Sequence, residues 1–189
     1  DDANVNVNLD PVYGNFNGST TSSLSNDNDF DDMWAGNGGL FSAWVYPKGA
    51  GEGSYGRLFQ KGANYCHIGS LSGGFVNISL GIDHSTTAGA WTTTNRVLPV
   101  DSWSHVAIAY DSDSTSNNPV IYVNGVSVAV TEGSAPAGSY NSDASSALYI
   151  GNKSDGSKTW DGYIMDVKIY KNVAVTATNV AKMASKINV

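Results

Sequence analysis

The chain has little cysteine, proline or charge and no long apolar run, and each shortage excludes a class of protein. Its 189 residues include one cysteine and five prolines. The single Cys66 excludes an intrachain disulfide and a cysteine-based zinc site, so we interpret it as a small buried hydrophobic residue. No apolar run reaches the ~18 residues that suggest a transmembrane helix, so we expect no membrane span.

Basic residues are also scarce. Ten Lys and Arg stand against 17 Asp and Glu, which gives a net charge of −7. Nucleic acid backbones are bound by clusters of Lys and Arg, and the chain has none, so we expect no nucleic acid partner. Charged residues make up only 14% of the chain. The surface should therefore be rich in Ser, Thr, Asn and Gly, which suits an extracellular or virion-surface location.

Alternating apolar and polar residues recur at strand length throughout the chain, which predicts an all-β domain. The clearest strands are residues 40–46, 74–82, 104–110, 119–130, 146–151 and 162–170. Asn124-Gly125 predicts a tight type I′ hairpin, because both residues tolerate a positive φ. Only residues 177–187 have a helical pattern, so we expect a short C-terminal helical tail. The length suits one large β-sandwich, and we expect a single domain over 1–189.

Several segments resemble, in the right order, the strands of laminin-G-like domains of the concanavalin A-like lectin/glucanase superfamily. They are residues 16–19 (the opening strand), 40–45 (an early strand), 102–110 and 120–125 (a central hairpin), and 148–151 and 161–170 (the closing strands). The resemblance implies a jelly-roll sandwich of two antiparallel sheets. It does not select a function, because this fold hosts lectins, adhesion modules, carbohydrate-binding modules, glycanases and virion proteins.

The sequence lacks the signatures of enzymes that share this fold. By the same resemblance, glycanases of the superfamily carry a strand with the pattern E-x-D-x-E. The only glutamates here, Glu52 and Glu132, lie in Gly-rich turns. The superfamily's lyases would show an Arg-rich strand, whereas Arg57 and Arg96 are isolated. We therefore predict that the chain is not an enzyme.

The favoured function is a non-catalytic glycan-binding or adhesion module of a secreted or surface assembly, whose partner is a glycan or a protein surface ligand. The alternative is a structural virion protein, such as a capsid decoration or tail-fibre domain, that binds other subunits or forms a homo-oligomer. A polysaccharide-active enzyme is the third hypothesis.

Aromatic residues in polar segments are candidates for carbohydrate binding, because a flat ring covers the apolar face of a sugar while nearby polar groups bind its hydroxyls. The predicted carbohydrate-binding residues are Tyr55, Tyr65, Trp91 and Tyr140. Among them Trp91 is the best candidate for an exposed ring, although core packing is an equal alternative. Strand alternation instead predicts that Trp44 and Trp103 belong to the core.

The most acidic stretch is a candidate calcium site. Asp27, Asp29 and Asp31 alternate there as at the start of an EF-hand loop. However, Asp32 stands where that loop needs Gly and Gly38 where it needs Glu, which excludes an EF-hand. A looser calcium site of carboxylates and carbonyls remains open, as does a solvated acidic loop.

Asp166 is the second candidate calcium ligand. The resemblance places it in a closing strand beside the opening strand, where related jelly rolls often hold a structural calcium. The alternative is that Asp166 lies on a solvated face and pairs with Lys168.

The calcium hypothesis has a direct test. A cation that binds only the folded chain adds about 2.7 kcal/mol to its stability when free calcium exceeds Kd about a hundredfold. For a chain of this size we expect the melting midpoint to be roughly 5–10 °C higher in millimolar calcium than in excess chelator. Coincident melting curves, with chelation checked by metal analysis, would contradict a calcium site.

Overall fold

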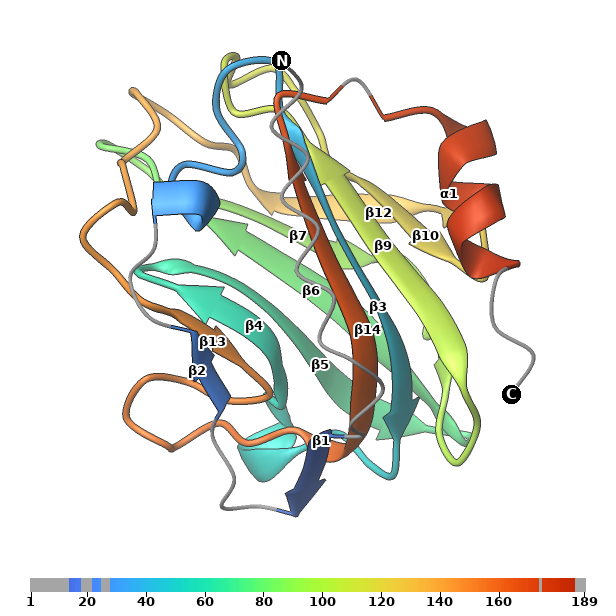
Figure 1. Ribbon diagram of the computed structural model, residues 1–189. Coiled ribbons are helices and arrows are strands. Elements are labelled where there is room, and N and C mark those ends of the chain that lie inside the picture. Colours follow the sequence, from blue (N-terminus) through green and yellow to red (C-terminus); the bar gives the residue numbers. More distant parts are fainter. Residues whose placement is uncertain (1–13, 18–21, 25–27, 174, 186–189) are drawn as a thin grey trace.

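Two antiparallel sheets face each other in the computed structural model, which describes residues 14–17, 22–24, 28–173 and 175–185 (Figure 1). Within these residues one sheet has six strands in the order β1-β14-β3-β9-β10-β11. The other has eight, in the order β12-β7-β6-β5-β4-β13-β2, with β8 pairing β6. This arrangement confirms the predicted all-β jelly-roll sandwich.

The six-stranded sheet consists of β1 (Gly14–Asn17), β14 (Asp161–Lys171), β3 (Gly39–Pro47), β9 (Ser104–Tyr110), β10 (Val120–Val123) and β11 (Val126–Val128). The eight-stranded sheet consists of β12 (Val130–Ser134), β7 (Gly89–Thr93), β6 (Phe75–Ile82), β5 (Asn64–Ser72), β4 (Arg57–Lys61), β13 (Leu148–Ile150), β2 (Ser22–Leu24) and β8 (Leu98–Pro99). Two short 3₁₀ turns, η1 (Asn28–Phe30) and η2 (Glu52–Ser54), and the helix α1 (Ala177–Ala184) complete the described elements.

All six predicted strand segments are strands in the structure: they form β3, β6, β9, the β10–β11 hairpin, β13 and β14. In the hairpin, Asn124 and Gly125 have φ values of 50° and 80°, which confirms the type I′ signal. The predicted helical tail begins at Ala177, where the side chain of Thr176 caps it by accepting a hydrogen bond from the Asn179 amide.

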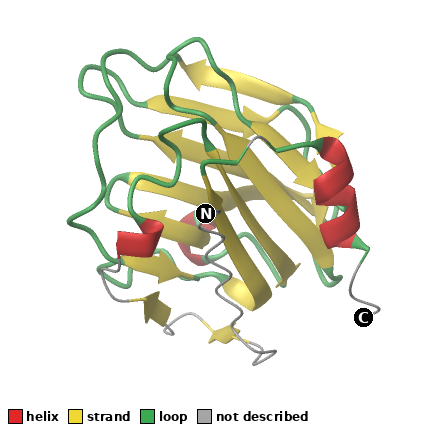
Figure 2. Ribbon diagram, turned by 45° about the horizontal axis from the view of Figure 1, so that its top comes forward, coloured by secondary structure: helices red, strands yellow, loops and turns green. Residues whose placement is uncertain are grey.

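The core fills the space between the sheets, and the outer face of the six-stranded sheet is also largely buried. On β3, Phe41 and Val45 point into the core, so Leu40 lies on the opposite face. There Leu40 packs with Val180 of α1, and Figure 2 shows the helix lying along that side of the molecule. None of the helices in the described ranges is long and apolar enough to cross a membrane.

The two tryptophans assigned to the core are not part of the cluster between the sheets. Trp44 is buried, but on the outer face, with its ring edge-to-face against His105 at 5.6 Å between centroids. Trp103 is only half-buried and packs against Tyr46 at 5.7 Å. The predicted burial is confirmed for Trp44 but not for Trp103, because strand alternation separates two faces without saying which one faces the other sheet.

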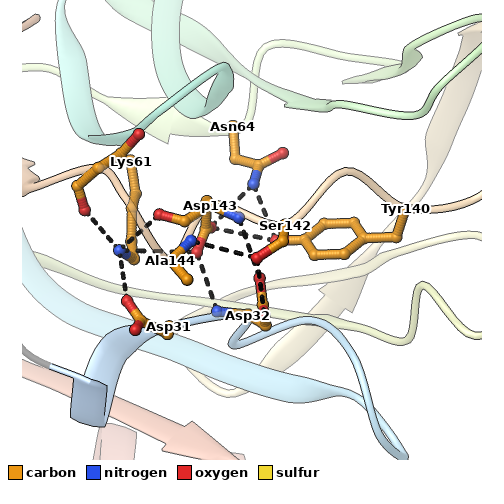
Figure 3. A network of polar contacts seen from close by, with 9 residues as sticks. Asp31, Asp32, Lys61, Asn64, Tyr140, Ser142, Asp143 and Ala144 are labelled. Carbon is orange, nitrogen blue, oxygen red and sulfur yellow. Dashed lines mark hydrogen bonds and ion pairs between the residues drawn. The ribbon is translucent and has the colours of Figure 1, made fainter.

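A buried lysine at the end of β4 holds two loops against the eight-stranded sheet (Figure 3). Lys61 of β4 is 1% exposed. Its Nζ donates to Asp31 Oδ1 at 2.9 Å and to the Asp143 carbonyl at 3.0 Å, and it lies 3.6 Å from Asp143 Oδ1. It also donates to the carbonyl of Ser146. Hydrogen bonds to these oxygens offset the free-energy cost of removing the ammonium from water.

Asp143 extends this network beyond the lysine. Its Oδ2 accepts hydrogen bonds from the Asn64 amide at 2.9 Å and the Tyr140 hydroxyl at 3.1 Å. Asp143 and Asp32 also exchange hydrogen bonds, because the backbone N–H of each donates to the other's carboxylate at 2.9 Å. The network therefore joins two loops, far apart in sequence, to the adjacent strands β4 and β5.

We expect Lys61→Met to lower the free energy of unfolding by about 3–5 kcal/mol, because it leaves buried carboxylates without their cation. Urea denaturation followed by tryptophan fluorescence measures the loss. Lys153→Met is the matched control: its pair with Asp155 is 34% and 52% exposed, and such surface pairs contribute about 0–1 kcal/mol. Equal effects of the two substitutions would contradict a stabilising role for the buried ammonium.

Candidate functional site

A groove of about 320 Å³ lies on the outer face of the eight-stranded sheet. We call it the tyrosine groove and define it by Tyr55, Tyr65, His67, Asn77, Ser79 and Thr92. Strand alternation explains its lining: Cys66 and Ile68 of β5 point into the core, so Tyr65 and His67 point outward. The adjacent strands β6 and β7 add their polar outward side chains to the same face.

The loop before β4 places Tyr55 over β5. Glycines at 51 and 56 let the loop fold back on itself, since a Cβ on Gly51 would lie 2.3 Å from the Gly56 Cα. The amide of Glu52 donates to the Thr159 carbonyl at 3.0 Å, which fixes the loop to the segment before β14. Tyr55 projects from this loop and remains 50% exposed.

Three rings form the aromatic wall of the groove. His67 stands between two tyrosines: its ring stacks on Tyr65 at 5.5 Å and meets Tyr55 edge-on at 5.2 Å. The ring of Tyr65 lies over the next strand at Gly81, where a Cβ would be 2.4 Å from Tyr65 Cζ. Glycine at position 81 is therefore what allows this ring to lie against the sheet.

Two cations border the aromatic wall. The Arg57 guanidinium lies 4.0 Å above the Tyr65 ring, and its Nη1 is 2.9 Å from His67 Nδ1. The Lys158 ammonium lies 5.0 Å from the centre of the Tyr55 ring. Burial, followed by the charges of Arg57 and Lys158, lowers the pKa of His67 to about 4. His67 is thus neutral near pH 7, and its Nδ1 accepts the hydrogen bond from Arg57.

Polar groups form the rest of the groove. The hydroxyls of Ser79 and Thr92 share a hydrogen bond of 2.8 Å across β6 and β7. The amide oxygen of Asn77 is buried and has no hydrogen-bond partner among the residues that the structure describes. The residues that line the groove include no Asp or Glu. The groove therefore combines ring faces, hydroxyls and an amide, without an acidic group in its lining.

The structure brings together two of the four predicted carbohydrate-binding residues, Tyr55 and Tyr65, although Tyr65 lies in a strand and not in a loop. For Trp91 the core-packing alternative holds: it is 1% exposed and its ring packs 5.1 Å from that of Tyr110, although the residue lies at the groove. Tyr140 belongs to the Lys61 network, where its hydroxyl donates to Asp143.

The described calcium candidates, Asp29, Asp31 and Asp166, do not gather at one place. Asp27 lies outside the described residues, and Asp29 is exposed in η1. Asp31 contacts the Lys61 ammonium. Asp166 forms an ion pair with Lys168 on the other sheet, as the alternative reading had it.

The opening strand is described only from Gly14, which pairs with Ile164, so no described part of it lies opposite Asp166. The part of the chain that the structure describes holds no group of three or more His, Cys, Asp or Glu suited to a metal. Calcium binding through carbonyls, or with Asp27, remains a prediction for the melting experiment.

Sequence reasoning missed three residues that shape the groove: Arg57, His67 and Lys158. For His67 a signal was present, because Tyr65 and His67 alternate with the apolar Cys66 and Ile68. Arg57 and Lys158 carried no such signal. They are 101 positions apart and become neighbours because the Arg57 amide donates to the Lys158 carbonyl at 3.0 Å.

Comparisons with solved structures show the same fold in a sialidase module, in laminin domains and in the binding domain of a neurotoxin. The CBM40 module of the Ruminococcus gnavus IT-sialidase, bound to α2,3-sialyllactose, matches with a TM-score of 0.54 and 12% identity over 80% of this chain and 84% of the module. Domains LG4-5 of the mouse laminin α1 chain match with a TM-score of 0.50 and 13% identity over 82% and 39%.

The binding domain of botulinum neurotoxin serotype D/C matches with a TM-score of 0.50 and 14% identity over 79% of this chain and 36% of that one. This chain thus spans less than half of the laminin and neurotoxin chains, and at these identities the likeness is one of fold. No curated protein matches the chain at a significant level.

The family model described as the concanavalin A-like lectin/glucanases superfamily, of the laminin G type, matches residues 16–181, which is most of the chain. The chain therefore belongs to the laminin G type of the concanavalin A-like superfamily.

Proposed function

We propose that the chain is a non-catalytic glycan-binding module and that the tyrosine groove is its binding site. The observation that carries this proposal is the aromatic wall of Tyr55, His67 and Tyr65, which opens onto hydroxyl and amide groups of the same groove. A pyranose presents an apolar C–H face and a rim of hydroxyls. Ring faces bind the first, and polar side chains bind the second.

The exposure of Tyr55 supports the proposal. It leaves half of a large ring in contact with water, although the loop that holds it is fixed by backbone hydrogen bonds. A ring that is already held in place loses little conformational entropy when a ligand covers it. Glycan-bound solved structures of the same fold, such as the sialyllactose-bound CBM40 module, are consistent with this use of the sandwich.

The lining of the groove also supports a role without catalysis. Glycoside hydrolysis normally uses two carboxyl groups that flank the bond to be cleaved. No carboxylate lines the tyrosine groove. The nearby Glu52 has its Oε2 at 3.3 Å from the Thr159 amide, where it helps to hold the loop of Tyr55. An extracellular setting fits a glycan ligand and forms part of the same proposal.

Tyr55→Ala tests the position of the site. Loss of one stacking ring should weaken glycan binding by about 0.5–1.5 kcal/mol, or roughly three- to tenfold in Kd. A glycan array identifies a ligand, and isothermal titration calorimetry measures its Kd for each variant.

The matched control is Tyr163→Ala on the six-stranded sheet, a half-buried tyrosine that also has a lysine over its ring, Lys48 at 4.9 Å. Binding that is lost in the Tyr163 variant and kept in the Tyr55 variant would place the site on the other sheet. Binding to no glycan on the array would contradict the function itself.

The low pKa of His67 predicts how pH acts on the module. The folded-state pKa of about 4 lies below the ordinary value of 6.5, so the unfolded chain takes up this proton first. His67 should therefore reduce stability as the pH falls from 6.5 toward 4 and leave it unchanged above 6.5. Glycan affinity should stay constant across pH 5.5–8, where the folded histidine remains neutral.

An NMR titration of the imidazole signals measures this pKa directly, with His67→Gln to assign the signal. The same variant should make the loss of thermal stability in acid less steep than in the unaltered chain. A His67 pKa near its ordinary 6.5 would contradict the contact with Arg57.

A further inference from the structure

The charge at the tyrosine groove is opposite to the charge of the molecule. The chain as a whole carries −7, with 10 basic against 17 acidic residues. At the groove, two cations stand over the aromatic wall and the lining includes no carboxylate. Within the described ranges, neither Arg57 nor Lys158 forms an ion pair with a carboxylate. Such a local excess of positive charge attracts an anion.

Arg57 is held with part of its hydrogen-bonding capacity unused. Its Nε donates to Gln60 Oε1 at 3.3 Å and its Nη1 to His67, while the guanidinium carbon lies 4.0 Å from the centre of the Tyr65 ring. Nη2 has no partner among the described residues. A guanidinium in this fixed position presents its free edge to a planar carboxylate without having to be ordered first.

Lys158 adds a second charge on the same rim. Its amide donates to Asn152 Oδ1 at 3.1 Å and its carbonyl accepts from the Arg57 amide, so its backbone is fixed relative to Arg57. The nearest acid that acts on Arg57 is Asp155, which raises its pKa slightly against the larger lowering by burial. Asp155 is itself paired with Lys153 at 2.6 Å, so it does not neutralise the rim.

A purely structural role explains only part of this arrangement. Arg57 stabilises the aromatic wall through its contacts with Tyr65 and His67. Lys158 lies over Tyr55, at the open side of the wall. Its ammonium does not hold the wall together in the way that the guanidinium of Arg57 does. After burial, the charges of both Arg57 and Lys158 lower the pKa of His67, so both cations act at the same part of the aromatic wall, and an anion there would be attracted by both.

From these contacts we infer that the glycan bound by the tyrosine groove is acidic, with a carboxylate-bearing sugar whose carboxylate lies between Arg57 and Lys158. This inference rests on the proposed function, since it names the class of glycan for the same site. The sugar ring stacks on the exposed ring of Tyr55, while its carboxylate accepts hydrogen bonds from Arg57 Nη2 and Lys158 Nζ. The groove thereby selects acidic over neutral sugars.

The test compares three probes by isothermal titration calorimetry: an oligogalacturonide, its carboxyl-reduced neutral form, and a sulfated neutral glycan of similar length. We expect the oligogalacturonide to bind at least about tenfold more tightly than its reduced form, because charge-assisted hydrogen bonds are lost on reduction. We expect the sulfated glycan to bind more weakly than the carboxylate. Added salt should weaken binding of the two charged probes and leave binding of the neutral probe unchanged, since about 1 M salt shortens the Debye length to about 3 Å.

Lys158→Gln should weaken binding of the acidic probe about five- to tenfold and leave the neutral probe unchanged. Lys182→Gln on α1 removes the same charge from the other sheet and should change neither. Arg57→Lys keeps the charge but loses the planar fork, and its melting curve shows whether the fold is intact.

Each outcome separates the two proposals. Equal binding of acidic and neutral probes, abolished by Tyr55→Ala, would overturn the acidic specificity and keep the glycan-binding function. Tighter binding of the sulfated probe would show that the site selects sulfate instead of carboxylate, and it would overturn the inference. Binding of none of the probes, together with a blank array of acidic and neutral glycans, would overturn both.

Discussion

The two-residue period of a β-strand is the constraint on which the groove depends. In β5 the side chains of Cys66 and Ile68 point into the core, so those of Tyr65 and His67 must lie on the outer face. A register slip of one residue would exchange these pairs and leave two polar aromatic side chains between the sheets. The hydrophobic effect that closes the sandwich therefore also fixes which rings reach a ligand.

The second organising element is electrostatic. The loops that carry Asp31 and Asp143 would repel each other, and the ammonium of Lys61 lies between them with two backbone carbonyls around it. A cluster of carboxylates in a sequence does not show which cation neutralises it. Here a lysine that lies 30 positions along the chain from Asp31 supplies part of the neutralising charge. This is why an acidic run suggests a metal from the sequence alone, although the fold supplies a cation of its own.

Local patterns predicted the strands that alternate clearly and the turn that needs positive φ, and these suffice for the architecture. They did not predict β4, β5 and β7, although Tyr65 and His67 alternate with apolar residues in β5. Tyr55 and Tyr65 were chosen by residue type and lie together in the groove. For Trp91 the residue type left an exposed and a buried ring open, and the ring is buried. The pairing of Arg57 with Lys158 depends on long-range backbone contacts that no local pattern contains.

Gly81 gives the groove its depth by what it lacks. With no Cβ beneath it, the ring of Tyr65 settles onto the backbone of β6, and the guanidinium of Arg57 lies 4.0 Å from the centre of the ring. Even one methyl group at this position would come within 2.4 Å of the ring and lift it toward solvent. Among chains that share this fold, the size of the residue under such a ring thus determines how far the ring stands above the sheet. The room left in the groove for a ligand changes with that height, while the groups that contact the ligand stay the same.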